Sequence, residues 1–124
     1  MTRRLVELDQ FSYATEVDKK RLRREAQELK DYLSKLAPAD DTQNLRRLVM
    51  PFCEKALDGT LPLPLDVRKK PINIPRVLDA GGKVPERFEE LYARFFNTAV
   101  GARADVENRV ERGGKSYAWV DFED

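Results

Sequence analysis

The stretch 109-RVERGGKSYAWVDF-122 makes the chain α+β rather than all-helical, because within it the helical pattern of apolar residues gives way to a strand-like one. Gly113 and Gly114 stand between two runs in which apolar and polar residues alternate. A glycine pair readily takes the positive φ angles that a two-residue hairpin turn requires. The stretch therefore predicts a carboxy-terminal β-hairpin over residues 103–123. A competing interpretation continues the preceding helix through residues 102–112.

The position of the turn also predicts which residues of the two strands lie opposite each other. Counting back from the glycines places Val110 opposite Tyr117 and Asn108 opposite Trp119. Because successive side chains of a strand point to opposite faces, Tyr117 and Trp119 share one face and Phe122 lies on the other. One face must cover the helices, so we expect part of this set to be core. An isolated hairpin is only marginally stable, and residues 4–8 can supply a third strand.

Three segments between these strands have helical periodicity. The first begins at residues 15–18, where Thr15 can cap it, and ends before Pro38. The second contains Pro51, at which we expect a kink rather than a new helix because its apolar face continues in phase. The third begins at Pro85. The apolar faces comprise Leu22, Ala26, Leu29, Leu33 and Leu36 in the first segment, Leu45, Leu48, Val49, Phe52, Cys53, Ala56 and Leu57 in the second, and Phe88, Leu91, Tyr92, Phe95, Phe96 and Ala99 in the third.

Residues 58–85 contain five of the seven prolines of the chain. Repeated loss of backbone N–H donors excludes a long helix or a central strand there. The apolar residues of this segment are too numerous for a solvated linker. We expect an ordered, largely extended loop that wraps the core, with a short helical turn at residues 75–79.

Size and composition are those of one small domain. The chain has 124 residues, and we predict a single domain over residues 1–124. Its fold class is α+β: two or three amphipathic helices packed with a small carboxy-terminal β-hairpin, with the long proline-rich loop between helices. Charged residues make up 36% of the chain, yet the net charge is only +1. The total charge therefore gives no reason to expect nucleic-acid or membrane binding.

The chain lacks the residues of the commonest enzyme mechanisms. It has no histidine, which removes Ser-His-Asp and Cys-His pairs and mixed Cys/His zinc sites. Gly114-Lys115-Ser116 matches the end of a phosphate-binding P-loop, but Arg109 stands where that motif needs glycine and no helical pattern follows. Cys53 lies on an apolar helical face and is expected to be a small buried hydrophobe. We therefore predict no enzyme, no cofactor and no metal.

Acidic residues gather near the base of the predicted hairpin. Clustered carboxylates can hold Mg²⁺ or Ca²⁺, but the spacing of a calcium-binding loop is missing. A solvated acidic edge that discourages pairing between sheets is the favoured interpretation. The residues concerned are Asp105, Glu107, Asp121, Glu123 and Asp124.

Elimination of these chemistries leaves a small non-enzymatic protein-interaction module as the leading function. An adaptor, an inhibitor, an immunity protein or an accessory subunit would fit, and the partner would be another protein. The loop and the hairpin carry large apolar side chains that a partner could cover. The expected contact residues are Leu63, Leu65, Ile72, Tyr117 and Trp119.

The alternative function is nucleic-acid binding through a basic cluster at the start of the first helix. Such a cluster binds phosphates by releasing counterions. The same helix carries Glu25, Glu28 and Asp31, so its basic side chains could instead pair with acids three or four residues away. The hypothesis requires basic residues that share a face and lack acidic partners. The basic cluster comprises Lys19, Lys20, Arg21, Arg23 and Arg24.

The sequence also predicts a cytoplasmic location. A single cysteine forms no internal disulfide, which fits a reducing compartment. The amino-terminal segment MTRRLVELDQF lacks an apolar run of signal-peptide length, and no stretch approaches the roughly 18 apolar residues of a membrane span. We therefore expect no membrane association.

Overall fold

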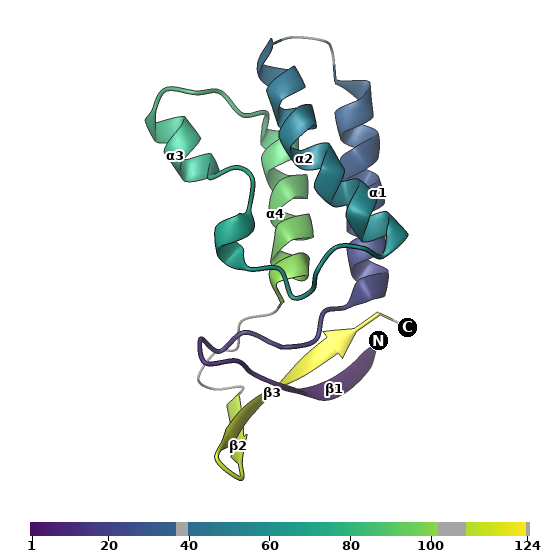
Figure 1. Ribbon diagram of the computed structural model, residues 1–124, viewed down its shortest axis with the longest axis vertical. Helices are drawn as coiled ribbons and strands as arrows, with labels where there is room; N and C mark the ends of the chain where they lie inside the picture. The colour runs from purple at the N-terminus through teal and green to yellow at the C-terminus, as the bar shows by residue number, and fades with distance from the viewer. Residues whose placement is uncertain (37–39, 102–108, 124) are drawn as a thin grey trace.

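The structure is a computed structural model that describes residues 1–36, 40–101 and 109–123. The helices lie together at one end of the molecule, and the sheet lies at the other end beside both chain termini (Figure 1). The predicted α+β fold class is confirmed, as is the carboxy-terminal hairpin. The elements are β1 (Thr2–Glu7), α1 (Lys19–Lys35), α2 (Asp40–Asp58), the 3₁₀ turn η1 (Val67–Lys69), α3 (Ile74–Asp79), α4 (Glu86–Val100), β2 (Arg109–Arg112) and β3 (Lys115–Phe122).

The helical layer forms because α1, α2 and α4 each carry an apolar stripe at helical spacing. α1 packs against both α2 and α4. Phe88, Phe95 and Phe96 of α4 are completely enclosed, and the rings of Phe95 and Phe96 meet edge to face with centroids 4.8 Å apart. Leu48, which was expected on the apolar face of the second helix, is instead exposed.

The first helix begins later than the sequence predicts. Its cap is Asp18, whose Oδ1 accepts a hydrogen bond from the Arg21 backbone N–H at 3.1 Å. The prediction that Thr15 caps the helix is wrong, because its hydroxyl and its backbone N–H both donate to the Glu7 carbonyl oxygen, at 2.9 Å each. Thr15 therefore extends the pairing of β1, and α1 starts one turn further along the chain.

The ends of the other helices follow from local chemistry. α2 continues through Pro51, so no new helix begins there. Arg46 of α2 donates to the carbonyl oxygens of Leu33 and Leu36, both at 2.9 Å, and so satisfies backbone acceptors at the end of α1. Pro85 is the N-cap of α4 and not, as predicted, its first helical residue; the helix begins one position later, at Glu86. Gly101 ends the helix with a φ of 97°.

The sheet has the strand order β1-β3-β2, and both pairings are antiparallel. Val110 pairs with Tyr117 as predicted, whereas Asn108 lies outside the described residues. Because residues 109–112 form a strand, the interpretation that extends the preceding helix to residue 112 is wrong for these four positions. The rest of that segment, residues 102–108, lies outside the described ranges.

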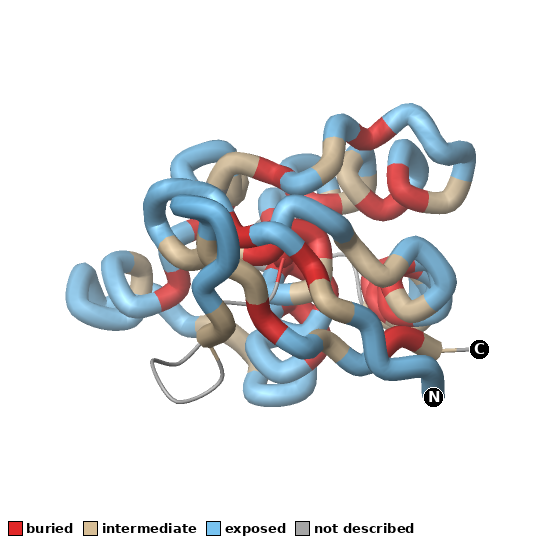
Figure 2. Tube along the Cα trace, turned by 90° about the horizontal axis from the view of Figure 1, so that it is seen from below, coloured by how far each residue is buried: buried red, intermediate tan, exposed pale blue. Residues whose placement is uncertain are grey.

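The third strand predicted at residues 4–8 is present as β1, and it pairs with β3 rather than β2. Along β3, Ala118 and Phe122 on one face are buried, whereas Trp119 and Asp121 on the other face are exposed. Figure 2 views the molecule from the sheet end and shows buried segments beneath an exposed outer surface. The inner face forms a small apolar cluster of its own, separate from the helical core. The buried members of this cluster are Val6, Leu8, Ala14, Ala118 and Phe122.

The proline-rich segment is built into the core. Its short helix α3 starts at Ile74, where Asn73 Oδ1 accepts from the Arg76 N–H, and so matches the predicted turn within one residue. Tyr92 of α4 fixes the segment, because its hydroxyl accepts from the Ile72 N–H at 3.1 Å and donates to the Ile72 carbonyl at 2.6 Å. The buried side chains of this segment are Leu61, Leu65, Ile72 and Ile74.

Candidate interaction surfaces

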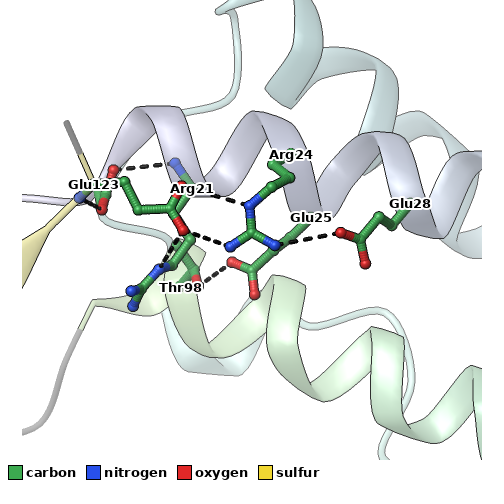
Figure 3. A network of polar contacts seen from close by, with 7 residues as sticks. Arg21, Arg24, Glu25, Glu28, Thr98 and Glu123 are labelled. Carbon is green, nitrogen blue, oxygen red and sulfur yellow. Dashed lines mark hydrogen bonds and ion pairs between the residues drawn. The ribbon is translucent and has the colours of Figure 1, made fainter. Parts of the chain in front are cut away.

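Two members of the basic cluster are bound to the residue that follows β3. Arg24 Nη2 lies 2.5 Å from Glu123 Oε1, and Arg21 Nε lies 3.4 Å from the same oxygen. Arg24 Nη1 also lies 3.3 Å from Glu28 Oε1 (Figure 3). The hydrogen bond from Arg24 is the main reason that the pKa of the Glu123 carboxyl is lowered. These two guanidinium groups are therefore engaged within the chain.

The other three members, Lys19, Lys20 and Arg23, are exposed and form no ion pair with any residue that the structure describes. Lys19 and Arg23 are one helical turn apart and face the end of α2. Arg21 and Arg24 instead reach toward β3. The basic cluster is thus divided between two sides of α1 and presents no single basic face.

A hollow of about 250 Å³ lies between the start of α1, the end of α2 and the loop that follows α2. We call it the Leu63 hollow. The cations Lys19, Arg23 and Lys55 and the apolar residues Leu22, Leu61 and Leu63 line it. The Leu63 side chain is half-buried, and its peptide bond to Pro64 is cis. The hollow thus brings a predicted loop contact together with two residues of the basic cluster.

A neighbouring hollow of about 470 Å³ shares Lys19 and Leu63 with the first. It lies between α1 and the sheet, and Arg4, Glu16 and Phe122 also line it. Arg4 Nη2 lies 2.7 Å from Glu16 Oε2, so the charges of these two residues are matched locally. Among the cations that line these two hollows, the three without an ion pair to a described residue all line the Leu63 hollow: Lys19, Arg23 and Lys55.

The outer face of the sheet carries the predicted aromatic pair. Trp119 of β3 is 46% exposed and lies opposite Leu5 of β1. The guanidinium carbon of Arg3 lies 5.9 Å from the centre of the Trp119 ring, within the range of a cation–π contact. Tyr117 is half-buried and belongs to the same face, since it stands two positions before Trp119 in β3. Phe122 points to the inner face, as the alternation predicts.

The remaining predicted contact residues lie in the core. Leu65 is 6% exposed and Ile72 is 8% exposed, and both belong to the helical cluster. Ile72 nevertheless also lines a hollow of about 500 Å³ beside α4, whereas Leu65 lines none of the hollows described for this structure. Of the three loop residues predicted as contacts, Leu63 and Ile72 each line a hollow, and Leu63 is the more exposed of the two.

The described residues contain no group of His, Cys, Asp and Glu side chains that could hold a metal. Cys53 is buried, and burial raises the pKa of its thiol to about 12. Asp121 is exposed, whereas Glu123 is paired with α1, and the other three residues of the predicted acidic edge lie outside the described ranges. Within those ranges, none of the helices has both the length and the apolar content to cross a membrane.

Sequence reasoning missed three residues that shape these surfaces. Lys55 is a lone base at the end of a helix, and only the fold brings it to Lys19 and Arg23. Leu5 was expected in a strand but had no predicted partner until the register paired it with Trp119. Glu123 was assigned to a solvated edge, and its distance of about 100 residues from Arg24 gave no local signal of the ion pair.

Comparison with known proteins gives no relative, since no family model, no curated protein and no solved structure matches the chain.

Proposed function

We propose that this chain is a non-enzymatic protein-interaction module, acting as an adaptor, inhibitor, immunity protein or accessory subunit. Its contact surface is the outer face of the sheet, centred on Trp119 with Leu5 and Tyr117 beside it. The observation that carries this proposal is the 46% exposure of Trp119 on a strand that is paired on both sides. The partner is a protein that covers this face with an apolar patch.

The physical argument rests on what an exposed indole offers a partner. Tryptophan supplies a large apolar area with few rotatable bonds and a single N–H donor, and it is enriched among the residues that dominate binding energy. Strand pairing with β1 and β2 fixes the β3 backbone, so little order has to be gained on binding. Arg3 stacks near the ring and can supply a polar contact at the rim.

Nucleic-acid binding through the first helix finds less support. Arg21 and Arg24 would have to leave Glu123 before they could contact a phosphate. Lys19, Lys20 and Arg23 remain, and they do not form the continuous basic stripe that tracks a phosphate backbone. A protein partner is therefore the preferred ligand. The experiment below includes a nuclease treatment that distinguishes binding to a protein from binding to nucleic acid.

The test is a pull-down from native extract with the tagged chain, with and without nuclease, followed by identification of bound proteins. We expect one stoichiometric partner that survives nuclease and is lost with Trp119→Ala, because removing a central anchor costs about 2 kcal/mol or more, roughly a thirtyfold loss of affinity. Leu78→Ala is the matched control, since Leu78 is 44% exposed and belongs to α3, which lies at the helical end of the molecule, away from the sheet (Figure 1). Binding that disappears with nuclease, or that Trp119→Ala leaves intact, contradicts the proposal.

We place this activity in the cytoplasm. The free, buried Cys53 needs no oxidising compartment and would keep its thiol in a reducing one. Fractionation of native cells should recover the chain with the cytoplasmic marker proteins. Recovery in a membrane or secreted fraction would contradict this location.

A further inference from the structure

The Leu63 hollow combines three positive charges with an apolar floor. Lys19 and Arg23 stand on one face of α1, and Lys55 approaches from the last turn of α2. None of the residues lining this hollow in the described chain is an acid. The floor is formed by Leu22 and Leu61, which are buried, and by Leu63, which is half-buried.

We propose that the Leu63 hollow binds an acidic peptide segment of a partner protein, with an apolar side chain of that segment seated on Leu63. This site goes beyond the proposed function, because it lies between the helices and not on the sheet face around Trp119. The carboxylates of the segment face Lys19, Arg23 and Lys55. The proposal can therefore hold or fail independently of the sheet face.

The charges of the hollow are not already neutralised by the described chain. Asp58 is one candidate for neutralising Lys55, since the charge of Lys55 contributes to the lowering of the Asp58 pKa. Its Oδ1, however, accepts hydrogen bonds from the Thr60 hydroxyl at 2.5 Å and from the Thr60 N–H at 2.9 Å. These bonds are the first causes of the lowered pKa, and Asp58 forms no ion pair with Lys55. Lys55 therefore remains available to an outside carboxylate.

The apolar floor favours a peptide over a nucleic acid. Proteins that hold single-stranded nucleic acid offer aromatic side chains on which bases stack. No aromatic residue lines the Leu63 hollow, whose floor consists of aliphatic side chains. An aliphatic floor between cations matches a peptide in which an apolar residue stands between acids. A phosphate backbone would use the cations and leave the leucines without a contact.

Binding is tested by fluorescence anisotropy of a short labelled peptide that carries a central leucine between two runs of glutamate. We expect the full chain to bind this probe, more weakly as salt rises because exposed charges are screened. The same peptide with serine in place of leucine should bind several-fold more weakly. A version with lysine in place of glutamate should not bind. Failure of the acidic probe to bind at low salt, or equal binding of the leucine and serine versions, overturns the proposal.

Charge-reversal variants locate the site. Arg23→Glu and Lys55→Glu should each lower the affinity for the acidic probe roughly three- to tenfold, because each replaces an attraction at the surface with a repulsion. Lys20→Glu is the matched control: it changes the net charge equally, lies on α1 and does not line the hollow. We expect it to change affinity less than about twofold. An equal loss with Lys20→Glu means a diffuse charge effect and overturns the proposal.

Two further measurements test whether the variants are misfolded and whether the hollow binds nucleic acid instead of a peptide. Circular dichroism of each variant should match that of the unchanged chain, since all three side chains are exposed. A labelled single-stranded oligonucleotide serves as the competing probe. If it binds more tightly than the acidic peptide and loses affinity with Arg23→Glu and Lys55→Glu, the hollow is a phosphate site and the peptide proposal is wrong.

Discussion

Glu25 is the only charged side chain that the described residues bury, at 8% exposure. Its Oε1 accepts a hydrogen bond from the Thr98 hydroxyl at 2.5 Å, between α1 and α4 (Figure 3). Burial raises the pKa of this carboxyl, and the hydrogen bond from Thr98 and the charges of Arg24 and Arg21 oppose the rise only in part. The ionised form is therefore less favourable in the folded chain than in the unfolded one.

The raised pKa of Glu25 predicts how the stability of the fold changes with pH. As pH rises above the ordinary Glu25 pKa of 4.5, the unfolded chain loses a proton that the folded chain retains, so this group lowers the free energy of unfolding. Glu25→Gln keeps an oxygen for Thr98 and removes the titration. We expect the variant to gain stability relative to the unchanged chain as pH rises from 4.5 toward 7, measured by urea unfolding at several pH values. A difference that stays constant with pH, or falls, would contradict the raised pKa.

For individual side chains, the sequence predicts the apolar faces better than the polar contacts. Leu22, Ala26 and Leu29 were expected inside because helical spacing alone puts them on one face. Glu25 lies next to that face, and nothing in a single sequence indicates that Thr98 stands opposite it. Hydrogen bonds between distant segments depend on the packing angle of two helices, which periodicity does not specify.

At the scale of elements, Asp18 joins α1 to the end of β3. Its Oδ1 caps α1 through the Arg21 N–H at 3.1 Å, while its Oδ2 accepts from the Glu123 N–H at 2.7 Å. One carboxylate thus satisfies backbone donors in both the helix and the strand segment. Arg21 and Arg24 add ion pairs to the same Glu123 side chain.

Two substitutions separate the two roles of Asp18. Asp18→Ala removes both hydrogen bonds and should cost about 1–3 kcal/mol of unfolding free energy. Asp18→Asn keeps an oxygen for the cap but turns an N–H group toward the Glu123 N–H, so we expect a smaller cost of about 1 kcal/mol. Chemical denaturation of both variants provides the measurement. If both variants lose the same unfolding free energy, the capping hydrogen bond to the Arg21 N–H contributes nothing to stability. If Asp18→Asn is as stable as the unchanged chain, the hydrogen bond to the Glu123 N–H contributes nothing.

The elements that the sequence predicted well are those with strong local chemistry. Gly113 and Gly114 fixed the hairpin turn, and the register of Val110 with Tyr117 followed by counting. The start of α1 was missed because both Thr15 and Asp18 are good caps in isolation. The difference lies in the Glu7 carbonyl, which engages Thr15 and leaves the cap to Asp18. That carbonyl becomes available only once β1 has formed.

At the scale of the whole molecule, the sheet and the helices have separate apolar clusters. Polar contacts around Asp18 and Glu123 join them. Gly101, which follows α4, also passes close to the Ala14 carbonyl of the sheet cluster, where a Cβ would lie 2.7 Å from the oxygen. The prediction of a single domain therefore depends on whether these contacts couple the two clusters.

We predict that the two clusters unfold together. Trp119 is the only tryptophan and lies in the sheet, so its fluorescence reports on the sheet, while the far-ultraviolet circular dichroism is dominated by the helices. The two signals should give the same denaturation midpoint within error, as in a two-state transition. A sheet transition at lower denaturant would instead mean two units of different stability.

The strand order has a consequence for translation. β3 is the partner of both β1 and β2, yet 108 positions separate Glu7 of β1 from Lys115. At roughly 5–20 residues per second, the ribosome needs roughly 5–20 s to add them. During that time the nascent chain can assemble its helices from nearer contacts, while β1 has no strand to join. A product terminated before residue 115 would keep the helical segments and lack both strand pairings.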